Sequence, residues 1–271
     1  MNVGNKKKDQ AELLMKAKAA LQYGNLYLGN KYIIEGNLKS NNELRKKPFR
    51  WEVINFLLSL NNSLATKYLE IGVRNPESNY NKILAIEKYG VDPGIENKSN
   101  PVEFKMTSDD FFTKLKDGEI LKKNTKFDVI FIDGLHKANQ VEKDIYNSLK
   151  YISDNGFIVI HDCNPPTEFH CRESYDFDLS PAGKMWNGTV WKAFYKLRFD
   201  KNVYCACIDS DWGIGIVSKL NYFKQLKKNI NPYFEFDIFD ANRAESLNLL
   251  SYQKFTKTLL RGPKLQKNLV Q

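Results

Sequence analysis

The sequence predicts an α/β fold: a seven-stranded, mostly parallel sheet with one antiparallel strand and helices on both faces. Strand-like and helix-like stretches alternate through the centre of the 271-residue chain, as in right-handed βαβ units. The candidates at 127–132 and 157–161 are apolar without polar alternation, which is typical of strands covered on both faces. Five residues separate the last two candidates, too few for a helical crossover, so these two form an antiparallel hairpin.

The expected strands lie at Lys67–Gly72, Lys88–Val91, Glu103–Met106, Phe127–Ile132, Phe157–His161, Val203–Ile208 and Ile214–Val217. The helices expected between them lie at Ser78–Glu87, Ser108–Leu115, Ala138–Ile152 and Val190–Leu197. Six strands therefore run parallel and one is reversed.

Helical periodicity also appears outside the strand-rich block, at 9–22 and 48–60 before it and at 241–250 after it. The pattern predicts three parts. Residues 1–47 form an N-terminal helical extension, residues 48–219 form the α/β domain, and residues 220–271 form a C-terminal helical extension.

Positive charge is concentrated in the flanks of the chain. The formal net charge is +9, with 41 basic and 32 acidic side chains. Residues 1–50 hold 11 basic and 4 acidic side chains, and residues 220–271 hold 9 and 4, so the central block is slightly acidic. Nucleic-acid binders concentrate basic residues on a recognition surface. The distribution favours solvated helical flanks, with a flank that meets an anionic substrate as the alternative.

The sequence indicates a globular protein of the cytoplasm. No apolar run approaches the roughly 18 residues needed to cross a bilayer, and no apolar stretch follows the charged first ten residues as in a signal peptide. Four cysteines in a chain of this length do not form a disulfide scaffold, so reduced thiols are expected.

Polar side chains follow the first five strands, at the edge where open α/β sheets bind ligands. They are Glu70, Asp92, Ser108, Asp109, Asp133, His136, His161 and Asp162. A protein with only a packed core has no need for such an arrangement. The sequence therefore predicts a binding site at this edge.

The first of these loops argues against a dinucleotide. It has one glycine, Gly72, preceded by Glu70, and not the Gly-x-Gly-x-x-Gly pattern that approaches a pyrophosphate. A carboxylate beside a single close-approach glycine suits a cationic cofactor without phosphate, such as S-adenosylmethionine. Asp92 follows Glu70 by 22 residues, at the position where an acid accepts hydrogen bonds from ribose hydroxyls.

Residues 68–73, 90–93, 127–136 and 156–162 together resemble the ordered motifs of class I S-adenosylmethionine-dependent methyltransferases, in the branch of bacterial small-molecule and sugar O-methyltransferases. The resemblance covers about Pro48 to Lys219 and implies a Rossmann-like seven-stranded sheet. It departs from the family at Asn75–Glu77, which replaces the later glycines of the first loop.

The resemblance also implies roles for individual residues. Glu70 and Gly72 contact the methionine part of the cofactor, and Asp92 contacts the ribose. Ser108 and Asp109 lie at the adenine edge, and Asp133 lies beside the methyl group.

Methyl transfer to oxygen requires alignment of the acceptor and removal of its proton. His136 and His161 follow neighbouring strands, and either is a candidate base because imidazole titrates near neutral pH. The alternative for each histidine is a structural role, in which it only forms hydrogen bonds with the edge of the loop. Asp133 and Asp162 are candidates to share a Mg²⁺ ion, as in some sugar O-methyltransferases of this branch, although Leu135 stands where such relatives often place a further acid.

Two further features follow the fifth strand. His161, Cys163, His170 and Cys171 are close in sequence, but their spacing matches no tight zinc-ligand pair, so packing of the thiols is favoured over a zinc site. Pro165–Met185 is long, polar and aromatic. We expect it to be a lid over the acceptor site, with a variable surface loop as the alternative.

The main hypothesis is an S-adenosylmethionine-dependent O-methyltransferase that acts on a small hydroxylated acceptor, such as a sugar or glycan precursor. The alternatives are a nucleic-acid or protein methyltransferase and a non-catalytic binding module on the same fold. The acids of the expected lid outnumber its bases, which disfavours a polyanion. The expected partner is thus a small-molecule or glycan acceptor, and a homo-oligomer of the chain is compatible with it.

Overall fold

A computed structural model describes residues 26–61, 65–175 and 180–263. The helix expected at 9–22 lies outside these ranges. No helix in the described part of the chain is long and apolar enough to cross a membrane.

The structure has one seven-stranded sheet with the strand order β2-β1-β3-β4-β6-β5-β7. Strands β1 to β4 are parallel, β6 is antiparallel to both β4 and β5, and β7 is parallel to β5. The strands are β1 (Lys67–Ile71), β2 (Glu87–Val91), β3 (Phe127–Ile132), β4 (Ile152–Ile160), β5 (Tyr204–Ile208), β6 (Ile214–Ser218) and β7 (Leu249–Leu250). The predicted fold class and the β5–β6 hairpin are confirmed.

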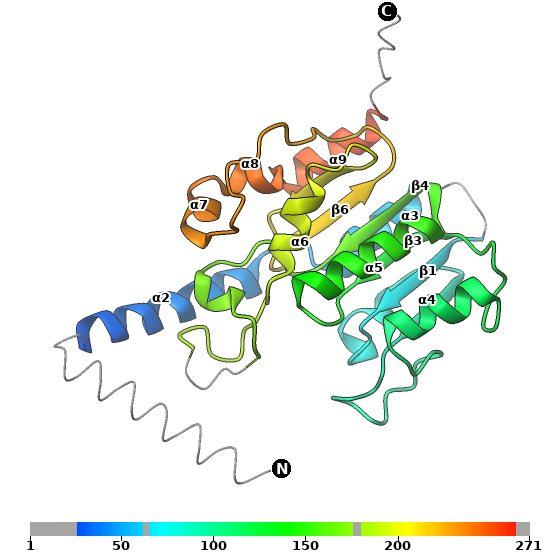
Figure 1. Ribbon diagram of the computed structural model, residues 1–271, viewed down its shortest axis with the longest axis horizontal. Helices are drawn as coiled ribbons and strands as arrows, with labels where there is room; N and C mark the ends of the chain where they lie inside the picture. Colours follow the sequence, from blue (N-terminus) through cyan, green and yellow to red (C-terminus); the bar gives the residue numbers. More distant parts are fainter. Residues whose placement is uncertain (1–25, 62–64, 176–179, 264–271) are drawn as a thin grey trace, which may run out of the picture.

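Helices cover both faces of the sheet, with α4 and α5 in front of it and α3 behind it in Figure 1. Apolar residues of α4, α5 and α6 share one buried cluster, and those of α3 and α9 share the other. The helices are α2 (Leu26–Arg45), α3 (Arg50–Ser59), α4 (Ser108–Asp117), α5 (Ala138–Tyr151), α6 (Val190–Leu197), α7 (Phe236–Ala241), α8 (Arg243–Leu247) and α9 (Tyr252–Leu260). Short 3₁₀ turns are η1 (Pro76–Ser78), η2 (Tyr80–Lys82) and η3 (Glu168–Cys171).

The register of the parallel strands brings their carboxyl ends to one level. Ile71 is paired with Val91 of β2 and with Ile132 of β3, and Ile132 is paired with Ile160 of β4. The residues that follow these four strands therefore leave the sheet side by side, which positions the candidate site.

The strand expected at Glu103–Met106 is wrong. Within the described residues only Phe104 forms an isolated bridge there, to Val91. The Glu103 side chain accepts a hydrogen bond from the backbone N–H of Gly90 at 2.8 Å, so this N–H does not pair with a strand. The seventh strand of the sheet is β7 instead.

The helix expected at Ser78–Glu87 is also wrong, because η1 and η2 are separated by Asn79. This residue has non-helical backbone angles, φ −145° and ψ −59°. Its buried amide donates to Glu70 at 2.8 Å and to the Tyr68 hydroxyl at 3.1 Å. A buried tertiary contact thus coincides with the break in the local helical pattern.

The C-terminal helix expected at 241–250 is shorter than predicted. Asn248 has a left-handed backbone with φ +48°, which ends α8, and the next two residues form β7. Helix α2 lies within the helical extension expected at 1–47, but its bounds were not predicted, because its buried residues are Gly36, Ser40 and Glu43 and not an apolar stripe. A Cβ at Gly36 would lie 2.4 Å from the carbonyl oxygen of Pro181. The domain boundaries at 47/48 and 219/220 stay a prediction.

Candidate active site

Gly72 joins the ends of three strands. Its N–H donates to Val91 O at 2.8 Å, and the N–H of Asp133 donates to Ile71 O at 2.9 Å. Gly72 has φ +94°, and a Cβ there would lie 2.2 Å from the carbonyl oxygen of Asp133. Only glycine combines this backbone conformation with so close an approach. The end of β1 is therefore fixed against the loop that carries Asp133.

Glu70 is a buried carboxylate held by two donors. The Tyr68 hydroxyl donates to it at 2.5 Å and Asn79 Nδ2 at 2.8 Å. Burial raises the pKa of Glu70 to about 7, although both hydrogen bonds act in the opposite direction. A cationic ligand beside it would favour the ionised form.

Asp92 directly follows β2, and its side chain has one described hydrogen bond, from the backbone N–H of Gly94 at 2.6 Å. Burial raises its pKa. Ser108 and Asp109 begin α4, where Gln140 of α5 donates to both, at 3.2 Å and 3.0 Å. The structure thus ties these two predicted residues to α5, and Asp109 is exposed.

Asp133, His136, His161 and Asp162 form one compact group, named here the carboxylate–histidine cluster. Asp133 Oδ1 lies 3.4 Å from His136 Nε2 and 3.2 Å from His161 Nδ1. Asp162 Oδ2 lies 3.0 Å from His161 Nδ1. Burial would raise the pKa of Asp133, but His161, His136 and Arg50 together hold it well below its usual value.

Two residues that the sequence analysis did not select complete this cluster. Arg50, the first residue of α3, donates from Nη1 to His161 Nε2 at 2.6 Å and to Asp211 Oδ1 at 3.2 Å. Asp211 lies in the β5–β6 turn and also accepts from the backbone N–H of Arg50 at 2.8 Å. Burial opposes ionisation of Asp211, but His161 and Arg50 lower its pKa to about 2.

The Arg50 contact corresponds to one protonation state of His161. A guanidinium can only donate, so a hydrogen bond from Arg50 requires the neutral ring, with its proton on Nδ1 facing Asp162. Burial and Arg50 lower the pKa of His161, whereas the surrounding aspartates raise it and prevail. Uptake of a second proton would therefore displace Arg50 from Nε2. Both nitrogens of His161 are engaged by protein groups.

His136 presents a different arrangement. Its Nδ1 lies 3.1 Å from the carbonyl oxygen of Trp186, and because a carbonyl oxygen only accepts, Nδ1 carries the proton. Nε2 then faces Asp133 Oδ1 across 3.4 Å as a second acceptor. Burial lowers the pKa of His136, but Asp162 and Asp133 raise it overall. Two facing acceptors need a proton or a cation between them.

Trp186 and Asn187 were also missed as site residues. The Trp186 ring stacks on His136 with centroids 5.0 Å apart. Asn187 is fully buried and donates to Asp162 Oδ1 at 2.8 Å. Asp162 has a left-handed backbone with φ +61°, a strained conformation for a non-glycine residue that is often found at functional sites.

One group of described residues has the geometry to hold a metal ion, namely Asp133, His136 and Asp162. The zinc alternative is not supported in the described part of the chain. His170 bonds Ser40 and Thr167 instead, and the thiols of Cys163 and Cys171 contact backbone carbonyl oxygens.

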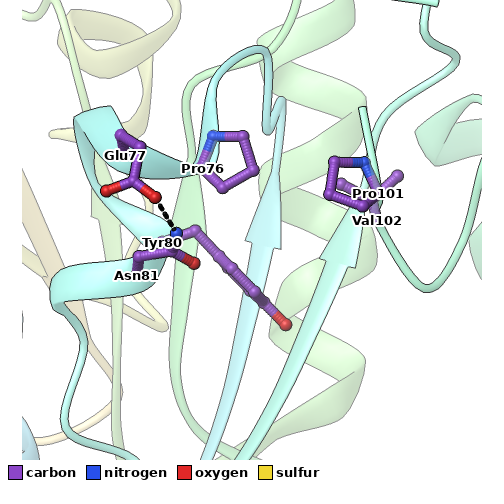
Figure 2. A pocket seen from close by; sticks show the side chains of 6 residues that line it. All are labelled: Pro76, Glu77, Tyr80, Asn81, Pro101 and Val102. Atoms are coloured by element: carbon purple, nitrogen blue, oxygen red, sulfur yellow. Dashed lines mark hydrogen bonds between the residues drawn. The ribbon is translucent and has the colours of Figure 1, made fainter. Parts of the chain in front are cut away.

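A separate pocket of about 240 Å³ lies beside η1 and η2. Figure 2 shows its lining, with Asn81 hydrogen-bonded to Glu77. The lining residues are Pro76, Glu77, Tyr80, Asn81, Pro101 and Val102. None of them is a predicted site residue, and Pro76 and Glu77 belong to the loop that follows β1.

Comparison with known proteins gives the family. A family profile described as a methyltransferase domain matches residues 69–163. This segment is a methyltransferase domain. It runs from β1 to the residue after Asp162 and contains the predicted cofactor residues and the carboxylate–histidine cluster. The resemblance to the class I S-adenosylmethionine-dependent methyltransferases is confirmed, and with it the expectation of an enzyme.

The chain is also similar to several solved structures. A protein from Corynebacterium glutamicum is 14% identical, with 78% of this chain and 99% of that chain covered and a TM-score of 0.41. An O-methyltransferase from Bacillus cereus in complex with SAH is 14% identical, with 69% and 89% covered and a TM-score of 0.38. The O-methyltransferase TomG from Streptomyces achromogenes, in complex with SAM, is 10% identical, with 62% and 78% covered and a TM-score of 0.38. No curated protein matches the sequence.

Proposed function

We propose that this methyltransferase domain transfers the methyl group of S-adenosylmethionine to a hydroxyl oxygen of a small acceptor such as a sugar or a glycan precursor. The observation that carries the proposal is the charge at the strand ends. The four carboxylates of Glu70, Asp133, Asp162 and Asp211 lie there, and they outnumber Arg50 and the two histidines beside them. This surplus of carboxylates suits a ligand with a sulfonium and an ammonium group.

The cofactor assignment follows the strand ends. Glu70 binds the methionine amino group, and the bare backbone of Gly72 allows the close approach. Asp92 binds the ribose through the oxygen that Gly94 leaves unused. Ser108 and Asp109 lie at the adenine edge, with Asp133 beside the methyl group.

His136 is the better of the two candidate bases. Its Nδ1–H is held by Trp186 O, so Nε2, which faces Asp133 Oδ1, is the nitrogen that takes up the acceptor's hydroxyl proton. The acceptor oxygen then forms a bond to the methyl carbon as the carbon–sulfur bond breaks, and the bonding electron pair stays on sulfur. His161, with both nitrogens bonded to protein groups, is the second candidate.

The residues also fit a divalent cation. Asp133, His136 and Asp162 offer ligand atoms close together, and a cation would satisfy the facing acceptors His136 Nε2 and Asp133 Oδ1. Bound there, Mg²⁺ would lower the pKa of the acceptor hydroxyl and orient it. Chelation distinguishes this version from the one in which His136 alone is the base.

The described part of the expected lid supports a small acceptor over a polyanion. Arg172 is directed into the protein, where it donates to the carbonyl oxygens of Phe169, Met185 and Gly183. The lid therefore does not offer this guanidinium as a phosphate contact. Glu168 and Glu173 add negative charge nearby.

Free thiols support the proposal that the protein acts in the cytoplasm. The four cysteines form no disulfide, and Cys163, Cys205 and Cys207 are buried. Such thiols suit a reducing compartment.

Titration calorimetry with S-adenosylmethionine tests the cofactor assignment. Asp92→Ala should weaken binding by about 1–3 kcal/mol, as for loss of a charged hydrogen bond. Asp154→Ala is the matched control, because this aspartate is fully exposed on β4. Equal affinity of Asp92→Ala and wild type would refute the ribose role. Cofactor-consumption screening with sugar nucleotides and lipid-linked glycans then tests the acceptor, and turnover only with a non-hydroxylated acceptor would overturn the proposal.

A further inference from the structure

Helix α2 lies against the polypeptide that follows β4, as Figure 1 shows for the blue helix and the adjoining yellow-green segment. Tyr32 contacts Phe169 edge to face, with ring centroids 5.6 Å apart. Gly36 lies against the backbone of Pro181, where a Cβ would clash. Further along the helix, the Ser40 hydroxyl lies 2.9 Å from His170 Nε2. Three successive turns of α2 thus contact this segment.

The hydrogen bonds of His170 have a defined direction. Ser40 donates its one hydroxyl proton to Gly36 O at 2.8 Å, so its oxygen accepts from His170 Nε2–H. Nδ1 is then unprotonated and accepts from the Thr167 hydroxyl at 2.8 Å. Burial lowers the pKa of His170 to about 4, which agrees with a neutral ring. His170 is fully buried, and both of its ring nitrogens are satisfied.

His170 also holds the backbone that leads to the carboxylate–histidine cluster. Its carbonyl oxygen accepts from the N–H groups of Asn187 and Gly188, at 2.9 Å and 3.1 Å. Residues 186–189, named here the connecting strip, then contact the cluster directly. Trp186 O faces His136 Nδ1, Asn187 donates to Asp162, and Thr189 N–H donates to His136 O at 2.8 Å.

We propose that Ser40 and His170 are positioning residues, through which α2 fixes the connecting strip and thereby the orientation of His136 and Asp162. This inference rests on the proposed function, in which those two residues serve the acceptor side. The connecting strip precedes α6 and has no helix or strand of its own. The bonds from His170 therefore help to place it, together with those of Trp186 to Arg172 O and of Ala138 N–H to the Thr189 hydroxyl. A helix outside the matched methyltransferase segment thus contributes to the geometry of the site.

Nitrogen-15 and proton NMR of the imidazole rings tests the proposal, because the chain has only three histidines. In Ser40→Ala the His170 Nε2–H loses its acceptor. We expect the ring signals of His170 and of His136 both to shift. Amide exchange at Asn187 and Gly188 should rise about 5-fold, the equivalent of one hydrogen bond. Ser40→Thr should restore the wild-type signals. Asn41→Ala, an exposed position one residue further on α2, should leave them unchanged.

The proposal is overturned if Ser40→Ala alters the His170 signals alone, or if Asn41→Ala produces the same changes. Should Ser40→Ala not fold, Thr167→Val removes the other bond to the ring, with Thr167→Ser as its control, and the same two criteria apply. Calorimetry with S-adenosylhomocysteine should give wild-type affinity for Ser40→Ala. Since the NMR and exchange measurements need neither cofactor nor acceptor, failure of wild-type protein to bind the cofactor would refute the proposed function separately.

Discussion

The two halves of the candidate site are built differently. On the cofactor side, Glu70 and Asp92 take their hydrogen bonds from residues close in sequence, namely Tyr68, Asn79 and Gly94. On the acceptor side, the hydrogen-bond partners belong to elements far apart in sequence. Arg50 and His161 are separated by 111 positions, and Arg50 and Asp211 by 161. The acceptor side is fixed by long-range contacts, whereas the cofactor side keeps acceptor atoms available for a ligand.

This difference separates two demands on the protein. A flexible cofactor can be bound by groups that adjust, but proton removal needs a base already held in place. Hydrogen bonds from α3, the β5–β6 turn and the connecting strip hold His136, His161 and their aspartates in place. These bonds provide the fixed base that proton removal needs. The predictions below test this contrast by disturbing one side and measuring the other.

The largest expected effect is on the acceptor side. His136→Ala should reduce single-turnover methyl transfer about 10²–10⁴-fold, the usual contribution of a general base, with cofactor affinity nearly unchanged. The rate is measured with and without EDTA once the screen has supplied an acceptor. Near-normal turnover, with or without chelator, would make His136 a loop residue and His161 the next candidate. Loss of cofactor binding as well would show a structural role. Loss of wild-type activity on chelation would favour the metal version.

The cofactor side should show a trade-off between stability and binding at Glu70. Its folded pKa of about 7 lies above the ordinary value of 4.5, so its stabilising contribution is complete below pH 4.5 and is lost as the pH rises through 7. The shift corresponds to about 3 kcal/mol. Relative to wild type, Glu70→Gln should therefore gain stability between pH 4.5 and 8 in urea unfolding, and should bind S-adenosylmethionine more weakly. A constant stability difference across this range would contradict the assignment.

The contribution of His170 to the free energy of unfolding should depend on pH in the opposite direction to that of Glu70. The pKa of His170 is lowered from 6.5 to about 4, so its contribution is complete above pH 6.5 and is lost as the pH falls through 4, by about 3 kcal/mol. The stability difference between wild type and His170→Gln should shrink by that amount over this interval. Measurement by urea unfolding at several pH values checks it. A difference that stays constant would mean that His170 titrates normally in the folded protein.

The sequence predicted the sheet and the residues at its edge because both depend on local patterns. Apolar strands such as 127–132 and polar residues just after them are visible in the chain itself. The helix at Ser78–Glu87 failed because Asn79 binds Glu70, and the strand at Glu103–Met106 failed because the Glu103 side chain takes the Gly90 N–H. Both errors arise from side-chain contacts that periodicity does not contain.

The partners on the acceptor side could have been found only in part. Asp211 follows β5, a strand parallel to β1 in the predicted sheet, so its turn belongs to the same edge. Arg50 begins the helix before β1, and a helix packed antiparallel to the next strand starts at that edge. Trp186 and Asn187 gave no comparable signal, since their position depends on the contact of α2 with His170.

The smallest expected effect is at Asp109, at the exposed end of the cofactor side. This carboxylate accepts from Gln140 Nε2 at 3.0 Å and lies 3.4 Å from Lys143 Nζ. A contact of such a solvated group with adenine replaces a contact with water, so Asp109→Ala should weaken S-adenosylmethionine binding by only about 1 kcal/mol. Calorimetry measures this, with Asp117→Ala at the other end of α4 as the control. A loss as large as that of Asp92→Ala would mean that the adenine end is fixed as firmly as the ribose, and an unchanged affinity would remove Asp109 from the cofactor site.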